Sequence, residues 1–197
     1  MRFSSVSGVR SVGVGVLVKV VFLDIDGVLA TAHTYNVWRK AAWAAAHPGQ
    51  PFPQGRAKRA FKKDAIANVP ADATLLDADC CARVQKLCDL SGAVIVISSS
   101  WRQDFPLDQL RTMLASKGIT APIVGATTTD GIHRGQQILD TVTTMGLTPT
   151  DIVILEDYEN VAPFNGRRIQ PAFDGSRAGF QDKHLARALA MFGITYP

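Results

Sequence analysis

Four short apolar segments, separated by stretches with helical periodicity, limit the possible fold more than any other feature of this chain. They are Val16–Leu23, Ala93–Ile97, Ile123–Val124 and Ile152–Leu155. Segments that are apolar at nearly every position and rich in Val and Ile are typical of strands buried on both faces of a sheet. The pattern therefore predicts an α/β protein, a doubly wound parallel sheet with helices on both faces.

The predicted helices occupy the stretches between and after these strands. They cover Asp77–Leu90, a stretch from Leu107 to about Gly118, Arg134–Met145 and Gln181–Phe192. The three cysteines of the chain, Cys80, Cys81 and Cys88, all fall on the first of these helices. They are odd in number and form no Cys-x-x-Cys pair, so we predict small buried hydrophobic residues rather than disulfides or a zinc site.

Length and charge set the domain organisation. With 197 residues, the chain is long enough for one domain with a modest insertion. We expect an N-terminal extension over 1–15, whose order the sequence leaves open, and a single domain over 16–197. The net charge of +4 and the pI near 9.1 are compatible with a polyanionic partner.

The apolar segments are too short to cross a membrane. The longest, Val12–Leu23, is interrupted by Lys19 and falls short of the roughly 20 residues that a spanning helix needs. The segment also continues into a strand that the core requires, which argues against a cleaved signal. We expect a cytoplasmic protein, with no membrane partner and no feature that requires a protein partner.

A segment at about 31–76 contains no clear core strand and is predicted to be an insertion after the first strand. Its seven basic residues against two acidic ones give it a charge of +5, and Trp and Phe residues are interleaved with them. Such a composition suits contact with a phosphorylated nucleotide or a nucleic-acid end. A solvated helical flap with Trp residues packed beneath it explains the same composition equally well.

Chemistry is expected where the strands end, because ligands of such sheets bind beyond the carboxyl ends of the strands. The first strand leads directly into Asp24, Ile25, Asp26 and Gly27. Two carboxylates so close together repel each other, and a bound cation would offset that repulsion. An ordinary Asp-Gly turn is the plainer interpretation, which the long buried run before it makes less attractive.

The other strand ends carry complementary groups. Ser98 and Ser99 follow the second strand, where hydroxyl and backbone N–H groups can hold a phosphate. Glu156 and Asp157 follow the Ile152–Leu155 strand and add carboxylate oxygens suited to a hard divalent cation. Arg134 opens the preceding helix, and His133 beside it is the one histidine placed to touch a substrate.

With these motifs the sequence resembles the haloacid dehalogenase-like (HAD) hydrolase superfamily, whose first motif is Asp-x-Asp-Gly after a hydrophobic strand. The segments that carry the resemblance are FLDIDGVL, VIVISSSWR and ILEDY. The combination of SSSWR, HRGQQIL and ILED is most similar to the branch named for Swiss-army-knife RNA repair proteins. The resemblance implies a Rossmann-like HAD fold, with the insertion at about 31–76 acting as a small cap.

The resemblance also implies a role for each strand-end residue. Asp24 would be the nucleophile that forms an aspartyl-phosphate, and Asp26 the general acid and base. Mg²⁺ would be held by Asp24, the backbone carbonyl of Asp26 and Asp157, with Glu156 supporting that shell. Ser98 or Ser99 would bind the phosphoryl group, and Arg134 would stand where the superfamily usually has Lys.

The chain is accordingly expected to be a Mg²⁺-dependent phosphatase, with a nucleic-acid end or a nucleotide slightly favoured as its phosphorylated substrate. A phosphatase of small metabolites would use the same chemistry. A non-catalytic binding module with the same fold is a third possibility, against which the intact pair Asp24 and Asp26 argues. Whether Arg102 contacts the phosphate or packs over a helix stays open at this point.

Overall fold

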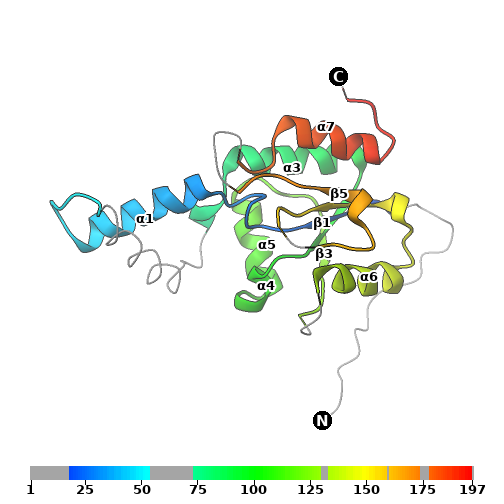
Figure 1. The fold of residues 1–197 in the computed structure, drawn as a ribbon, viewed down its shortest axis with the longest axis horizontal. Coiled ribbons are helices and arrows are strands. Elements are labelled where there is room, and N and C mark those ends of the chain that lie inside the picture. Colours follow the sequence, from blue (N-terminus) through cyan, green and yellow to red (C-terminus); the bar gives the residue numbers. More distant parts are fainter. Residues whose placement is uncertain (1–17, 54–72, 130–132, 159, 174–177, 197) are drawn as a thin grey trace, which may run out of the picture.

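The protein is built on one five-stranded parallel sheet, as seen in a computed structural model that describes residues 18–53, 73–129, 133–158, 160–173 and 178–196. The strand order is β3-β2-β1-β4-β5 (Figure 1). The strands are β1 (Val20–Leu23), β2 (Val94–Ile97), β3 (Ile123–Ala126), β4 (Ile152–Leu155) and β5 (Arg168–Ile169). The chain passes from β1 outward to β3 and then returns to place β4 on the other side of β1, which makes the end of β1 the switch point of the sheet.

The central strand β1 is fully buried because neighbours pair with both its edges and helices cover both its faces. Leu23 is in register with Ile97 of β2 and with Leu155 of β4. Val21 and Leu23 join one hydrophobic cluster, whereas Val20 and Phe22 join the other. This arrangement explains why β1 is apolar at every position and confirms the predicted doubly wound parallel sheet.

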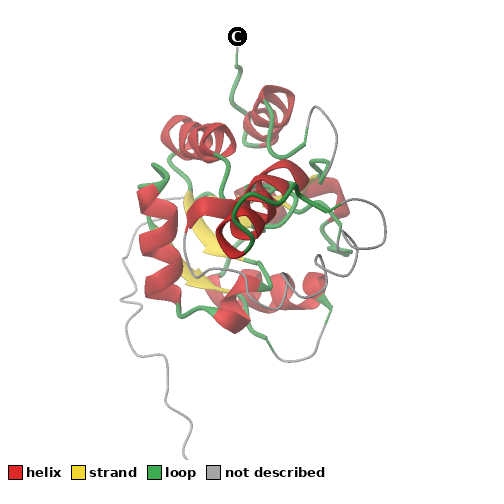
Figure 2. Cartoon of the chain, turned by 90° about the vertical axis from the view of Figure 1, so that its left-hand side faces the viewer, coloured by secondary structure: helices red, strands yellow, loops and turns green. Residues whose placement is uncertain are grey.

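Helices cover both faces of the sheet (Figures 1 and 2). On one face lie α3 (Ala78–Ser91), α5 (Leu107–Ser116) and α7 (Asp182–Met191), and on the other lies α6 (Arg134–Met145). The predicted helices are all present, within two residues of their expected ends. In α3, Asp77 caps the first turn and Gly92 ends the helix in the left-handed conformation at φ 68°, as helix C-termini commonly do. All three cysteines are buried and free, as predicted.

The largest element for which the sequence pattern gave no bounds is α1 (Ala32–Ala46), which begins the expected insertion and projects from the body (Figure 1). Thr31 caps it through a reciprocal pair of hydrogen bonds with Thr34. Arg39 is its one buried residue among the described ones, so α1 lacks the apolar stripe by which amphipathic helices are recognised. Residues 54–72 of the insertion lie outside the described part.

The smaller elements also departed from expectation. The short helix α4 (Trp101–Asp104) and the two-residue strand β5 were not predicted, nor were the 3-10 turns at Ala73–Leu75, Pro149–Asp151 and Asn165–Arg167. The first strand begins at Val20 rather than Val16, and the expected extension over 1–15 lies outside the described residues. None of the described helices has the length and apolar character needed to span a membrane.

Candidate active site

The carboxyl ends of the three central strands bring the predicted site residues to one edge of the sheet. Asp24 follows β1, and its backbone N–H donates to the carbonyl of Leu155 at 3.0 Å. Ser98 follows β2, and its N–H donates to the carbonyl of Leu23 at 2.8 Å. These bonds extend the sheet ladder by one residue, so Asp24 lies between the ends of β2 and β4.

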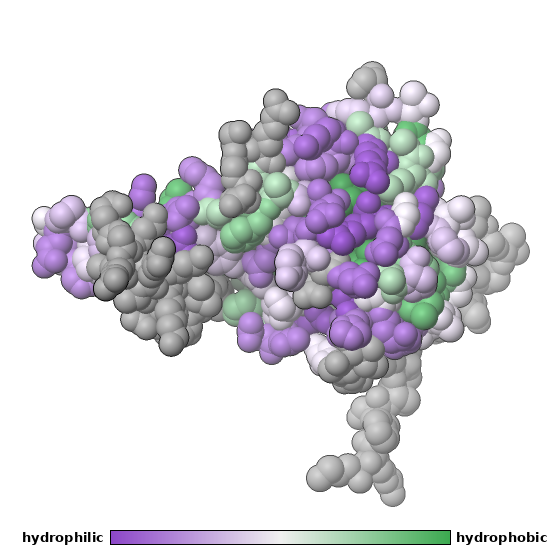
Figure 3. All heavy atoms as spheres, viewed as in Figure 1, coloured by the Kyte–Doolittle hydropathy of each residue, from purple (hydrophilic) through white to green (hydrophobic). Residues whose placement is uncertain are grey.

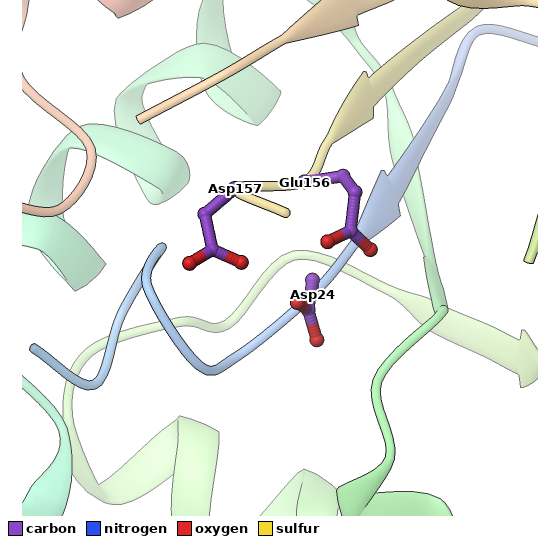
Figure 4. Close-up of side chains that lie close together, drawn as sticks. All are labelled: Asp24, Glu156 and Asp157. Atoms are coloured by element: carbon purple, nitrogen blue, oxygen red, sulfur yellow. The ribbon is translucent and has the colours of Figure 1, made fainter. Parts of the chain in front are cut away.

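Three carboxylates meet at this edge (Figure 4). Asp24, Glu156 and Asp157 each offer one oxygen, and these oxygens lie within 4.8 Å of one another. Asp24 and Glu156 are almost wholly buried. Burial first, and then the charge of Glu156, raise the pKa of Asp24 well above its usual range and that of Asp157 to about 6.

Repelling carboxylates held in a buried place are the donor set that a hard divalent cation takes. The residues present therefore fit a divalent metal, and Glu156 belongs to the cluster itself rather than standing behind it. Asp26 is expected to contribute its backbone carbonyl and not a side-chain oxygen. Among the described residues no cysteine or histidine belongs to the cluster.

Gly27 makes room for this cluster. Its backbone has φ +73°, and a Cβ built there would lie 2.0 Å from the Oδ2 atom of Asp157. Because both the backbone conformation and the close approach exclude a side chain, the glycine after Asp26 is a requirement of the site. The turn that follows β1 can then pass directly beneath the Asp157 carboxylate.

The Asp26 side chain is held apart from the cluster by two donors. Tyr35 of α1 donates its hydroxyl to Oδ1 at 2.7 Å, and Trp101 of α4 donates Nε1–H to Oδ2 at 3.1 Å. Burial raises the pKa of Asp26, while these two hydrogen bonds act in the opposite direction. Neither partner of Asp26 was identified from the sequence, since aromatic residues at these positions give no signal of their own.

The two serines after β2 differ in their contacts. The Ser99 side chain donates a hydrogen bond to the Asp24 carboxylate and also accepts the N–H of Trp101. The Ser98 hydroxyl is buried and has no hydrogen-bond partner among the described residues. Thr127, which directly follows β3, carries a second buried hydroxyl of this kind and was not singled out from the sequence.

Arg134 lies against the acidic cluster. Its Nε atom is 3.5 Å from a Glu156 oxygen, its side chain is only 10% exposed, and its Nη1 atom has no partner within the described chain. Gly135 allows this position, because a Cβ there would lie 2.0 Å from the carbonyl oxygen of Ala162. The first turn of α6 therefore packs directly on the loop that follows β4. His133, the other residue expected there, is exposed.

Two further arginines hold the backbone of the site. Arg102 donates to the carbonyl oxygens of Ser99, Thr127 and Thr128 and to the side chain of Gln137. Burial first, and then the charge of nearby Arg134, lower the pKa of Arg102 to about 10. Arg102 thus joins the loops after β2 and β3 to α6 through these hydrogen bonds.

Arg168 does the same for the carboxylate loop. It donates to the carbonyl oxygens of Glu156 and Asp157, each at 3.0 Å. No pattern in the sequence indicates this role, because Arg168 stands in a strand too short to be recognised.

Comparison with known proteins gives one family match. A family model described as the HAD domain in Swiss Army Knife RNA repair proteins matches residues 20–185. Among solved structures, a haloacid dehalogenase-like family hydrolase from Streptococcus pneumoniae is 14% identical, with a TM-score of 0.44 over 87% of this chain and 91% of that one. No curated protein matches the chain.

Proposed function

Because this chain belongs to the family of HAD domains found in Swiss Army Knife RNA repair proteins, we propose that it is a Mg²⁺-dependent phosphatase with an aspartyl-phosphate intermediate. Family membership by itself supports a hydrolase. The observation that carries the finer proposal is the meeting of three carboxylates with buried donors, Ser98 Oγ and Arg134 Nη1, that have no partner among the described residues. Carboxylates suit the cation, and free donors suit the phosphoryl oxygens.

In the proposed first step, an oxygen of Asp24 attacks phosphorus and the bond to the leaving oxygen breaks. Asp26 gives its proton to that oxygen. In the second step, Asp26 takes a proton from a water molecule that attacks the phosphorus of the aspartyl-phosphate, which releases phosphate and restores Asp24. The raised pKa of Asp26 favours the protonated form that the first step needs.

Asp24, Glu156 and Asp157 would hold the metal, together with the backbone carbonyl of Asp26. When bound, Mg²⁺ supplies charge that offsets the carboxylates and neutralises the phosphoryl oxygens. Arg134 adds a guanidinium with several donors in a plane, where a lysine would add a point charge. Ser98 is the serine proposed to bind phosphate, since Ser99 already donates to Asp24.

We place the cap at about 31–76 within a domain over 16–197, preceded by an extension over 1–15. Helix α1 is the longest described element of this cap, and its Tyr35 reaches Asp26. A nucleic-acid end or a nucleotide is the favoured substrate because of the basic and aromatic composition of the cap. Phosphate esters of small metabolites are the second candidate.

Phosphate release, measured with Mg²⁺ and with EDTA, tests the proposal. The substrates are an aryl phosphate and oligonucleotides phosphorylated at the 3′ or the 5′ end. We expect metal-dependent release that is lost in Asp24→Asn and kept in Asp108→Asn, a matched change at an exposed surface ion pair. Release by Asp24→Asn would remove Asp24 from the role of nucleophile, and no release from any substrate would favour a binding module.

A further inference from the structure

An open groove of about 360 Å³ lies beside the carboxylate loop and has no part in the chemistry proposed above. Its described lining consists of one aromatic ring, two guanidinium groups and three amides, from Tyr158, Asn160, Asn165, Arg168, Gln170 and Arg187. None of these residues is acidic. The groove therefore combines positive charge with amide donors and an apolar ring.

The groove shares a peptide with the active site. The carbonyl oxygen of Asp157 accepts hydrogen bonds from Arg168 Nη2 at 3.0 Å and from Gln170 Nε2 at 2.8 Å. Tyr158 is the next residue along the chain. The groove therefore adjoins the peptide of Asp157, whose carboxylate is proposed to hold the metal.

Tyr158 presents its ring to solvent, with 84% of the residue exposed. It is the most exposed of the large hydrophobic residues in the described chain, and most of the others are about half exposed. An aromatic ring with a free face stacks favourably on a nucleic-acid base, whichever base that is.

The cations of the groove complement a phosphodiester backbone. Arg187 of α7 is exposed and makes no ion pair with a described residue, so its charge is available to a ligand. Arg168 is half-buried, and its donors to the carboxylate loop fix its position beneath the groove. Hydrophilic side chains cover much of the face around β5, where Arg168 lies (Figure 3).

We propose that this groove binds the nucleotide next to the terminal phosphate of a single-stranded nucleic acid. Its base stacks on Tyr158, and its phosphodiester lies against Arg187. The proposal rests on the proposed phosphatase function and deepens it, because the groove selects strands over small phosphate esters. A small ester would fill the phosphate site alone and leave the groove empty.

Binding is measured by fluorescence anisotropy with a labelled, terminally phosphorylated oligonucleotide, in the Asp24→Asn background so that the strand is not turned over. Adding Tyr158→Ala should weaken binding roughly 5- to 150-fold, the range for loss of one stacked base. Tyr158→Phe keeps the ring and should bind like the parent. Ribose and deoxyribose strands of one sequence, each with a 3′ or a 5′ phosphate, then distinguish the kind of strand and the kind of end that the groove prefers.

The charge of the groove is tested by the salt dependence of binding. Arg187→Ala should reduce the slope of log K against log salt concentration by about 0.7, the value for one lost phosphate contact with a single strand. Lys183→Ala removes an exposed charge from the same helix outside the groove and should leave this slope unchanged. Equal effects of the two changes would overturn the proposal.

Hydrolysis of the aryl phosphate separates the groove from the active site. In the protein that keeps Asp24, Tyr158→Ala and Arg187→Ala should leave the hydrolysis of the aryl phosphate unchanged and raise KM for the oligonucleotide. If both substrates lose activity equally, or if the parent binds no oligonucleotide, the groove proposal is wrong. If the parent releases no phosphate but its oligonucleotide binding depends on Tyr158, the phosphatase proposal fails and the groove proposal stands.

Discussion

Two glycines with almost the same φ angle show how differently the body and the proposed cap of this protein are built. Gly27 in the turn after β1 has φ +73°, and Gly49 in the turn after α1 has φ +78°. A Cβ at Gly27 would collide with the Asp157 carboxylate, whereas at Gly49 it would meet no atom of the described residues within 4 Å. Within the described residues, the turn at Gly27 is therefore restricted by both packing and backbone conformation, and the turn at Gly49 by backbone conformation.

The largest expected effect comes from replacing these two glycines by alanine. Gly27→Ala must displace Asp157, and a misplacement of about 1 Å at an active site can cost on the order of 100-fold in rate. Gly49→Ala carries only the strain of the left-handed backbone, about 1 to 2 kcal/mol. Phosphate release and thermal unfolding of both variants measure the difference. Similar losses of activity would mean that the crowding at Gly27 has no functional weight.

A smaller effect is expected for the hydrogen bond from Tyr35, in the proposed cap, to Asp26, the proposed general acid. Tyr35→Phe removes the donor to Asp26 Oδ1 and should lower kcat about tenfold, with little change in KM for a small ester. The matched control is Tyr196→Phe, which removes a hydroxyl bonded to Lys86 on the surface. A change in KM alone would place Tyr35 in substrate binding.

Metal binding should stabilise the body more modestly. At tenfold its Kd, Mg²⁺ adds about 1.4 kcal/mol to the free energy of unfolding, which raises Tm by roughly 3 to 6 °C in a chain of this size. Asp157→Asn should abolish this rise, and Asp108→Asn should keep it. A rise that survives in Asp157→Asn would show that the cation binds elsewhere.

The accessibility of thiol groups compares the body with the proposed cap without a change at the candidate active site. Burial raises the pKa of Cys80, Cys81 and Cys88 to about 12, so at pH 8 the folded protein should not react with a thiol reagent. A cysteine introduced in the cap by Val37→Cys, at a residue 55% exposed, should react at once. Reaction of the native cysteines before unfolding would contradict the expectation that the folded body excludes the reagent.

The same thiols give a pH dependence with a definite sign. Their pKa is higher in the folded than in the unfolded chain, so their contribution to stability is complete below about pH 9. It should be lost as the pH rises from about 9 toward 12. The Tm measured across this range, with Cys81→Ser as the comparison, checks the direction.

The sequence predicted those helices and strands in which several residues are buried in a regular pattern. Strand β4 and helix α6 were predicted at their observed bounds, because a run of four buried apolar residues and a helix with one buried stripe are unambiguous patterns. Strand β5 could not be predicted in this way. It has two residues, and the first, Arg168, turns its donors toward the carboxylate loop.

The site was predictable in its residues but not in their contacts. That Asp24, Ser98, Arg134 and Asp157 meet follows from parallel strands ending at one edge. Ser99 rather than Ser98 donates to Asp24 because of the way the chain turns after the last residue of β2. The spacing of residues in the sequence does not reveal this turn. That Glu156 joins the cluster depends in the same way on the end of β4.

The central position of β1 also sets an order of events during synthesis. Asp24 is made early, yet the strand that completes its surroundings, β4, lies about 130 residues later in the chain. Until β4 has been made, one edge of β1 is open and Asp24 has neither Glu156 nor Asp157 beside it. A nascent chain shorter than this therefore contains Asp24 without the two neighbouring carboxylates of the candidate site, Glu156 and Asp157.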